Sequence, residues 1–245
     1  MGGPVTLILA GGCAVWALPG DGTCAGFARR VVRQVAGGLG MPDGLAYDLA
    51  VAVSEIATNA FVHAGPQEAG PAEMWIYVRR ARSELVVKVF DTAPWRGPIR
   101  YGPLRPGTES EGGRGFEVVD ALAVEHGGAW GMHRTRSRLG ASAPGKAVFV
   151  SVPVSGVVST ESRPVRQVAW ELYALLEARG VGEVRCSLGH GMAVICVQAA
   201  VNVWVGERGI SYCVPGGGVA RHALCDGIEV VERVVRHCAD LGAGG

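Results

Sequence analysis

Glu55 and Asn59 are the two residues of this sequence whose types and spacing most clearly suit chemistry. They lie in the run LAYDLAVAVSEIATNAFVH, residues 45–63, and side chains at i and i+4 share one face of a helix. A carboxylate beside an apolar surface must be paired, hydrated or used in chemistry. Taken alone, such a pair is more often a solvated helix face, so the neighbouring elements decide its meaning.

A helix over residues 45–63 is predicted by apolar side chains that recur at helical spacing. These side chains form one stripe that should face a core: Leu45, Leu49, Ala52, Val53, Ile56 and Ala60. Glu55 and Asn59 lie beside this stripe. Pro42 suits the helix start, where a missing N–H costs nothing, and Gly65-Pro66 should close the helix.

Asp91 stands at the end of a predicted buried strand. Residues 84–90 are nearly continuously apolar, residues 74–80 alternate, and residues 81–83 should join the two strands as a tight hairpin. A carboxylate at a strand end, before a Pro-containing turn, is a common position for a ligand-binding residue. Asp91 is therefore the second candidate site residue.

A long segment rich in Pro, Gly and Arg follows, over residues 92–112. A loop of this length inside a compact domain is usually a functional lid or disordered. It ends in Gly112-Gly113-Arg114-Gly115, before a helical run over residues 116–124. A glycine loop at a helix N-terminus offers N–H groups and positive dipole to a phosphate. For an isolated GGRG, a flexible turn before a helix is the commoner explanation.

The same loop carries arginines and a tryptophan that have two interpretations each. The arginines form either an electropositive lid over phosphates or a solvated surface. They are Arg96, Arg100, Arg105 and Arg114. Trp95 could stack on a nucleotide base, although packing in the core or lid is the commoner use.

The rest of the chain predicts a first domain over residues 1–155, a linker over 156–164 and a small α+β domain over 165–245. The first domain should add a strand at 14–18, a helix at 24–36 and strands at 129–135 and 146–152. The second has roughly the order αβββα with a possible extra strand. Its elements are a helix at 165–178, strand candidates at 183–188, 192–199, 201–205 and 210–214, and a helix at 219–238.

Composition excludes several classes of protein. The chain has 245 residues, 49% of them hydrophobic, which is enough for one large domain or two small ones. A net charge of +1 gives no global attraction to nucleic acid or anionic membranes. The short, Gly-broken apolar run at the N-terminus fits an export signal poorly, and no run reaches the length of a membrane span. A cytoplasmic location is therefore expected.

The cysteines indicate reduced thiols. There are seven, without a CxxC pair, which argues against a disulfide framework. Five lie in the C-terminal part, where His222 and Cys225 are three apart and His237 precedes Cys238. This grouping raises a zinc hypothesis, but the spacing matches no strong zinc pattern, and buried free thiols are the commoner outcome.

In their order, spacing and intervening strands, these signals resemble the GHKL (Bergerat-fold) ATPases. More narrowly, they resemble the anti-sigma-factor serine/threonine kinases in their actinobacterial histidine-kinase-like form. The segment SEIATNAFVHA is similar to the N box, VKVFDTAP to the box containing the aspartate, and GGRGFEVVDALA to the glycine box. The segment EHGGAWGMHRTRSRLGASAPGKAVFVSVP is similar to the closing hairpin of that family. The resemblance covers residues 10–154.

The resemblance implies a fold and a set of roles. The fold is a two-layer α/β sandwich of the α+β class, with helices on one face of a mixed sheet. Glu55 would be the general base for a seryl hydroxyl or a water, and Asn59 would ligate Mg²⁺. Asp91 would accept a hydrogen bond from the adenine amino group of ATP. The phosphates would be bound by backbone N–H groups of Gly113, Arg114, Gly115 and Phe116, with His63 at the same region or at the solvent rim.

Two functions follow from the resemblance. The first is a Mg-ATP-dependent kinase that phosphorylates a small anti-anti-sigma partner and controls a sigma factor, as a homodimer that binds neither nucleic acid nor membrane. The second is a degenerate ATPase-fold module that acts by protein binding. The second is favoured by two departures: Thr92 and Ala93 follow Asp91 where glycines are usual, and Lys146-Ala147 stand where a threonine is usual.

Overall fold

The computed structural model describes residues 3–63, 70–94, 100–101, 114–156, 163–197, 201–213 and 218–242. The chain forms two compact units. Unit 1 comprises Met1–Val78 and Arg82–Val157, and unit 2 comprises Arg79–Ala81 and Val158–Gly245. Each unit has its own hydrophobic core.

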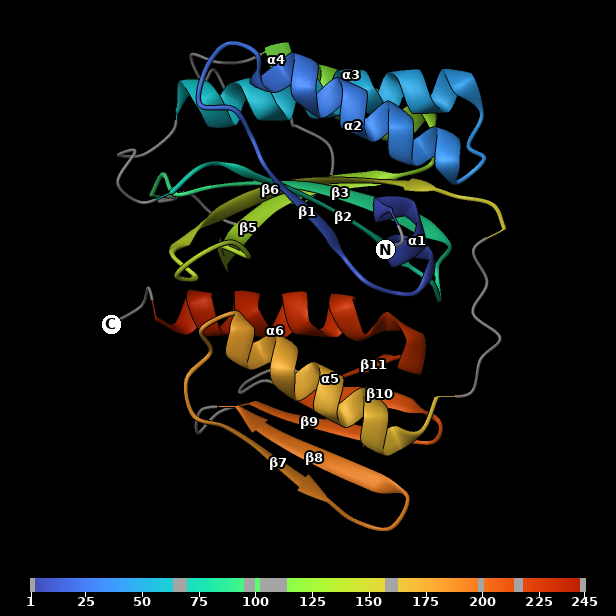
Figure 1. Ribbon diagram of the computed structural model, residues 1–245, viewed down its shortest axis with the longest axis vertical. Coiled ribbons are helices and arrows are strands. Elements are labelled where there is room, and N and C mark those ends of the chain that lie inside the picture. Colours follow the sequence, from blue (N-terminus) through green and yellow to red (C-terminus); the bar gives the residue numbers. More distant parts are fainter. Residues whose placement is uncertain are drawn as a thin grey trace. The chain divides into compact units, whose positions relative to one another are not determined.

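Unit 1 is a two-layer α+β sandwich with helices packed on one face of a six-stranded sheet (Figure 1). The strand order is β1-β2-β3-β6-β5-β4. The helices are α1 (Pro4–Leu9), α2 (Cys24–Gly38), α3 (Asp43–Val62) and α4 (Arg114–Glu125). The strands are β1 (Ala14–Ala17), β2 (Glu73–Arg79), β3 (Glu84–Asp91), β4 (Arg100–Tyr101), β5 (Ala129–Arg136) and β6 (Pro144–Pro153).

The predicted fold class is confirmed, and the details of unit 1 differ at four places. The recorded pairings of β1 with β2, β3 with β6, β6 with β5 and β5 with β4 are antiparallel, so over these strands the sheet is not mixed. The N-terminal apolar run forms the short helix α1. Two residues of the predicted long loop form β4, which pairs with β5. The helix predicted at 24–36 continues through Gly37 and Gly38.

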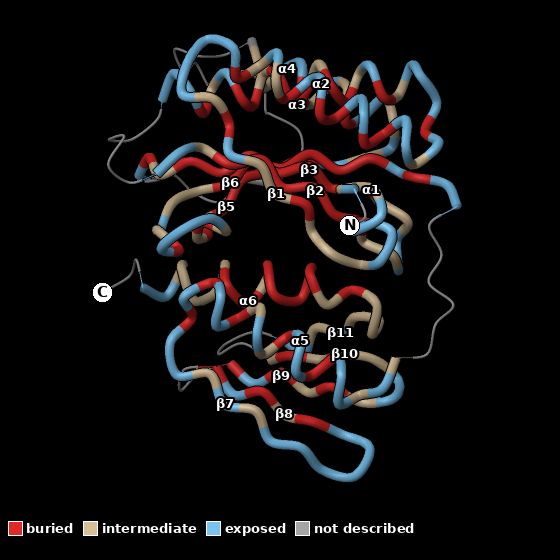
Figure 2. Tube along the Cα trace, viewed as in Figure 1, coloured by how far each residue is buried: buried red, intermediate tan, exposed pale blue. Residues whose placement is uncertain are grey.

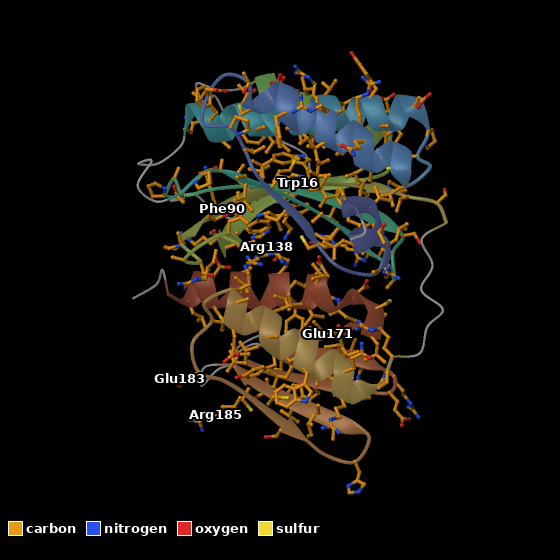
Figure 3. The ribbon with its side chains drawn as sticks, viewed as in Figure 1. Trp16, Phe90, Arg138, Glu171, Glu183 and Arg185 are labelled. Carbon is orange, nitrogen blue, oxygen red and sulfur yellow. The ribbon has the colours of Figure 1, made fainter. Side chains whose placement is uncertain are left out.

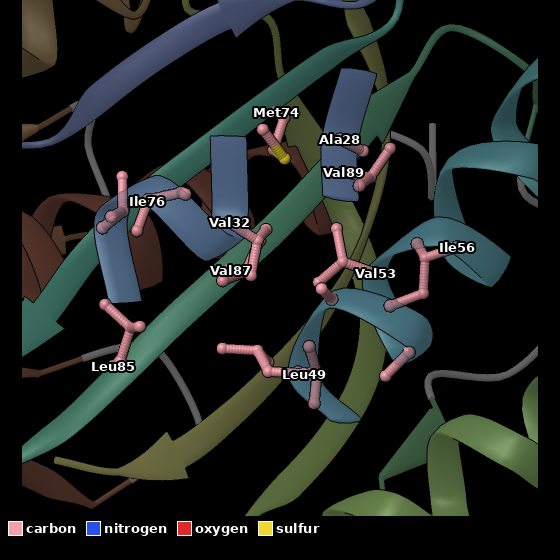
Figure 4. Packing of buried hydrophobic residues seen from close by; sticks show 14 of the residues in the cluster. Ala28, Val32, Leu49, Val53, Ile56, Met74, Ile76, Leu85, Val87 and Val89 are labelled. Atoms are coloured by element: carbon pink, nitrogen blue, oxygen red, sulfur yellow. The ribbon is translucent and has the colours of Figure 1, made fainter. Parts of the chain in front are cut away.

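Alternation of side chains along β3 divides the sheet into two faces. Leu85, Val87 and Val89 point to the helices, where they join the main core. The predicted stripe of α3 packs against them, and Figure 2 shows buried positions along both layers. Figure 4 shows the packing of α2 (Ala28, Val32), α3 (Leu49, Val53, Ile56), β2 (Met74, Ile76) and β3 (Leu85, Val87, Val89).

On the other face of the sheet, Trp75 forms a small second cluster with Phe90 and Ala147. The Trp75 ring stacks on Phe90 at 5.6 Å between ring centroids, and the guanidinium carbon of Arg138 lies 5.4 Å from the centroid of the Trp75 ring. Phe90 and Arg138 are labelled in Figure 3. The indole N–H of Trp75 donates to Glu73, which also accepts from the backbone N–H of Arg138 at 2.9 Å. These contacts fix the turn between β5 and β6, and therefore the start of β6.

Helix α3 is long and apolar enough to cross a membrane by length and composition. Nine of its residues are buried in unit 1, and a buried core helix of a globular domain passes the same test. Among the described residues α3 is the sole helix to do so.

Unit 2 packs two helices on one face of a five-stranded antiparallel sheet of order β11-β10-β9-β8-β7. Its strands are β7 (Val184–Leu188), β8 (Met192–Val197), β9 (Val201–Gly206), β10 (Gly209–Cys213) and β11 (Val219–His222). Its helices are α5 (Val165–Ala178), as predicted, and α6 (Gly227–Leu241).

The helix predicted over residues 219–238 is wrong in its first part. Val219–His222 pairs with β10 as a fifth strand, and a 3-10 turn at Leu224–Asp226 precedes α6. Val219 and Ala220 are compatible with either state, and the open edge of β10 decides in favour of the strand. The unit predicted as αβββα with a possible extra strand therefore contains a five-stranded sheet.

Candidate functional site

Asp91 lies at the end of β3, on the face of the sheet that carries the helices. It follows Leu85, Val87 and Val89 in the alternation of that strand. In the register of β3 and β6, Asp91 stands opposite Lys146. The Lys146 ammonium donates to both carboxylate oxygens, at 2.5 Å and 2.6 Å, and the backbone N–H of Ala93 donates to Oδ1 at 3.0 Å. The carboxylate is thus fixed in position by three hydrogen bonds.

The electrostatic environment of Asp91 combines burial with nearby positive charge. Burial raises the pKa of the Asp91 carboxyl above its ordinary value, because a buried carboxylate loses hydration. The Lys146 ammonium and the N–H of Ala93 lower that pKa in part, and His63 adds a weaker effect of the same sign. The observed pair is therefore a buried ion pair with its lysine partly open to solvent.

Glu55 and Asn59 lie on α3, two turns and one turn before its end at Val62. Gly115 of α4 is packed against both. A Cβ added to Gly115 would lie 3.2 Å from Glu55 Oε2 and 3.4 Å from Asn59 Nδ2. The structure therefore brings the N-terminal turn of α4 directly onto the carboxylate–amide pair that the sequence singled out.

Helix α4 runs from Arg114 to Glu125, and the N–H groups of its first turn have no partner within the helix itself. The helix is held by its own contacts with β5. Phe116 stacks on Trp130 at 5.4 Å, and the Trp130 indole N–H donates to Asp120 at 2.6 Å. The Phe116 side chain is thus a packing group, and it is the backbone of this turn that faces Glu55 and Asn59.

His63 caps the C-terminal end of α3 and is exposed. Its charge contributes weakly to lowering the pKa of Asp91. Gly113, Trp95, Arg96 and Arg105 lie outside the described residues, as do the side chains of Arg100 and Arg114. The predicted cationic lid therefore stays a prediction.

The contact of Lys146 with Asp91 was not predicted from the sequence. The sequence marks Lys146 only as a departure from a usual threonine. The signal that identifies the contact is the pairing register, in which Asp91 faces Lys146 and Lys146 faces Arg134. That register depends on the hairpin of β5 and β6 and on the long-range pairing of β6 with β3, and it cannot be read from local periodicity.

The zinc hypothesis for the C-terminal part gains no support from the described residues. His222 stacks on Tyr212 at 5.7 Å. Within the described ranges, the group with three metal-ligating side chains lies in unit 1, at Asp48, Glu125 and His126. His126 Nε2 there lies 2.8 Å from Asp48 Oδ2, so these two side chains already form a hydrogen bond with one another.

Helices on one face of a sheet, a Glu–Asn pair on the central helix and a glycine at the start of the next helix define a GHKL-type ATPase domain. Residues 21–134 match the family described as histidine kinase-like ATPase domain, and this match supports a GHKL-type ATPase domain in the N-terminal part of the chain. The predicted resemblance to GHKL ATPases is confirmed at this level. No curated protein matches the chain.

A domain of this family implies ATP binding, and the residues present fit that ligand. The buried Asn59 Nδ2 has no hydrogen-bond partner among the described residues. A phosphate oxygen would satisfy this donor, or the turned amide would offer Oδ1 to a cation. The missing side chain of Gly115 leaves room for ligand atoms at the same point. The ATP-binding regulatory character of the domain rests on the family match and these fits.

Proposed function

We propose that this protein is a cytoplasmic Mg-ATP-dependent serine/threonine protein kinase of the anti-sigma-factor type. Its substrate would be a seryl or threonyl hydroxyl on a small anti-anti-sigma partner, and it would hold a sigma factor inactive when that partner is absent. The observation that carries the proposal is the contact of Gly115 with Glu55 and Asn59. A carboxylate, an amide and the first turn of a helix therefore lie around one point, and this arrangement supports the proposal.

Each residue has a role that its surroundings support. Asn59 would hold Mg²⁺ through its amide oxygen, with phosphate oxygens and waters completing the shell. Bound Mg²⁺ would neutralise charge that develops on the phosphates during transfer. The backbone of the first turn of α4 would orient the terminal phosphates. Asp91 would accept a hydrogen bond from the adenine amino group.

Glu55 would take the proton from the attacking hydroxyl. The hydroxyl oxygen forms a bond to the γ-phosphorus as the bond from that phosphorus to the bridging oxygen of ADP breaks. The proton passes to a Glu55 carboxylate oxygen, and ADP leaves with the electron pair of the broken bond. Loss of such a base typically slows transfer by about 10²- to 10⁴-fold.

The test is γ-phosphoryl transfer from Mg-ATP to candidate partner proteins, read by mass spectrometry of the intact partner. In Glu55→Gln, transfer should fall by roughly 10²- to 10⁴-fold while ATP still binds. Asp43→Asn is the matched control, because Asp43 is an exposed carboxylate on the same helix. Equal transfer by Glu55→Gln and the wild type would remove Glu55 from the chemistry.

A protein-binding module without catalysis is the second candidate function. The observation that favours it is the ion pair of Lys146 with Asp91, since both oxygens of the adenine-side carboxylate already have a donor. Calorimetry with Mg-ATP separates the two functions. No heat of binding from the folded wild type would remove the kinase proposal and leave the binding module.

A further inference from the structure

The pair of Asp91 and Lys146 has hydrogen-bonding capacity left over. A carboxylate offers about four acceptor positions, two on each oxygen. Oδ1 accepts from Lys146 and from Ala93, whereas Oδ2 accepts from Lys146 alone among the described residues. One acceptor position therefore stays open on Oδ2. The Lys146 ammonium has three N–H groups, of which two are used on Asp91, so with respect to the part of the chain that the structure describes one donor also stays open.

These two open positions lie next to each other. The ammonium nitrogen is 2.6 Å from Oδ2, and the Asp91 side chain is 4% exposed, whereas that of Lys146 is 14% exposed. Both residues project from neighbouring strands toward the helix layer of unit 1, in register with one another. The site thus presents one acceptor and one charged donor side by side, on a rigid sheet.

Adenine carries the complementary pattern on one edge. Its exocyclic amino group is a donor, and the adjacent ring nitrogen N1 is an acceptor. A hydroxyl-bearing residue in place of Lys146 would supply only a neutral donor, and an ammonium donor forms a stronger hydrogen bond. We infer that Lys146 is a specificity-determining residue of the nucleotide site, which donates to adenine N1 while Asp91 accepts from the adenine amino group. This inference rests on the proposed binding of ATP.

The opposite role for Lys146 makes the opposite prediction. If the lysine simply occupied Asp91 and excluded the base, its removal would strengthen ATP binding. If it were only a structural partner of Asp91, its removal would weaken all adenine nucleotides equally. The three roles are separated by how the effect of the substitution depends on N1.

The experiment is calorimetric titration of the full chain with Mg-ATP and with the triphosphate of 1-deazaadenosine, in which a C–H replaces N1. The wild type should bind the 1-deaza nucleotide about 10- to 100-fold more weakly than ATP, the usual range for one hydrogen bond to a charged group. In Lys146→Met the two nucleotides should bind within about twofold of each other. Lys146→Arg, which keeps a charged donor, should restore at least part of the difference.

The matched ligand control is the triphosphate of 7-deazaadenosine, which keeps N1 and loses a different ring nitrogen. Its affinity relative to ATP should be the same in the wild type and in Lys146→Met. Tighter ATP binding by Lys146→Met, or an unchanged penalty for the 1-deaza nucleotide, would overturn the inference while nucleotide binding stands. Absence of any nucleotide binding by the folded wild type would overturn the proposed function as well.

Discussion

Asp91 and Lys146 show how one substituted position changes a site without changing a fold. Their side chains meet because β3 and β6 pair in a register that sets residue 91 opposite residue 146. A lysine at that position converts a lone buried carboxylate into an ion pair. Removal of one partner of such a pair is costly, since it leaves the other charge buried and unpaired.

The first prediction concerns the pH dependence of stability in Lys146→Met. Burial raises the pKa of the Asp91 carboxyl above 3.8, and Lys146 opposes that rise. A folded carboxyl with a raised pKa binds its proton more tightly than the unfolded chain does, so its contribution to stability falls as pH rises from 3.8 through the folded pKa. Loss of Lys146 raises the folded pKa further and widens that range.

The stability gap between wild type and Lys146→Met should therefore grow as pH increases from about 4 toward neutrality. Thermal unfolding midpoints at a series of pH values measure this gap. Lys146→Arg retains the positive charge and should stay close to the wild type throughout the series. A gap that is constant or that narrows with pH would show that Lys146 does not control the charge of Asp91.

At the scale of elements, the N-terminal turn of α4 decides what Glu55 and Asn59 can bind. Gly115→Ala should weaken Mg-ATP binding or transfer by roughly ten- to a hundredfold, because its methyl group would lie 3.2 Å from Glu55 Oε2 and crowd the space for ligand atoms. Stability should change little, since the preference of alanine over glycine in a helix, about 1 kcal/mol, opposes the cost of this close contact.

Gly37→Ala is the control for that substitution. Gly37 lies in α2, and an added Cβ would meet no heavy atom within 4 Å. This variant should gain some stability and bind ATP as the wild type does. Equal ATP affinity in Gly115→Ala and Gly37→Ala would mean that the turn at residue 115 is not part of the nucleotide site.

Elements with strong periodicity could be predicted from the sequence, and elements defined by their partners could not. The apolar stripe of α3 and the bounds of α5, Val165–Ala178, follow from helical spacing alone. Val219–His222 is a strand because β10 offers it an open edge, which no local pattern reveals. In the same way, Glu55, Asn59 and Asp91 could be predicted as candidates, but the Lys146 contact depends on a long-range register.

At the scale of the whole molecule, two separate cores make the units distinct targets for substitution. The core of unit 1 includes Leu49 of α3, and that of unit 2 includes Leu172 of α5. All residues assigned above to the nucleotide site belong to unit 1. Damage to the core of unit 2 should therefore leave that site intact.

Leu172→Ala should cost about 2–5 kcal/mol of the stability of unit 2, since the leucine is 2% exposed and its loss leaves a cavity. The affinity for Mg-ATP, measured by calorimetry below the unfolding temperature, should stay within about twofold of the wild type. Leu188→Ala removes the same atoms from a residue that is 44% exposed, and should lower stability far less. Leu49→Ala should destabilise unit 1, because the leucine is buried in its core. In that variant, the unfolding midpoint should rise with the concentration of Mg-ATP, since the ligand binds only the folded unit. A drop in ATP affinity in Leu172→Ala as large as the drop in stability would show that unit 2 supports the nucleotide site energetically.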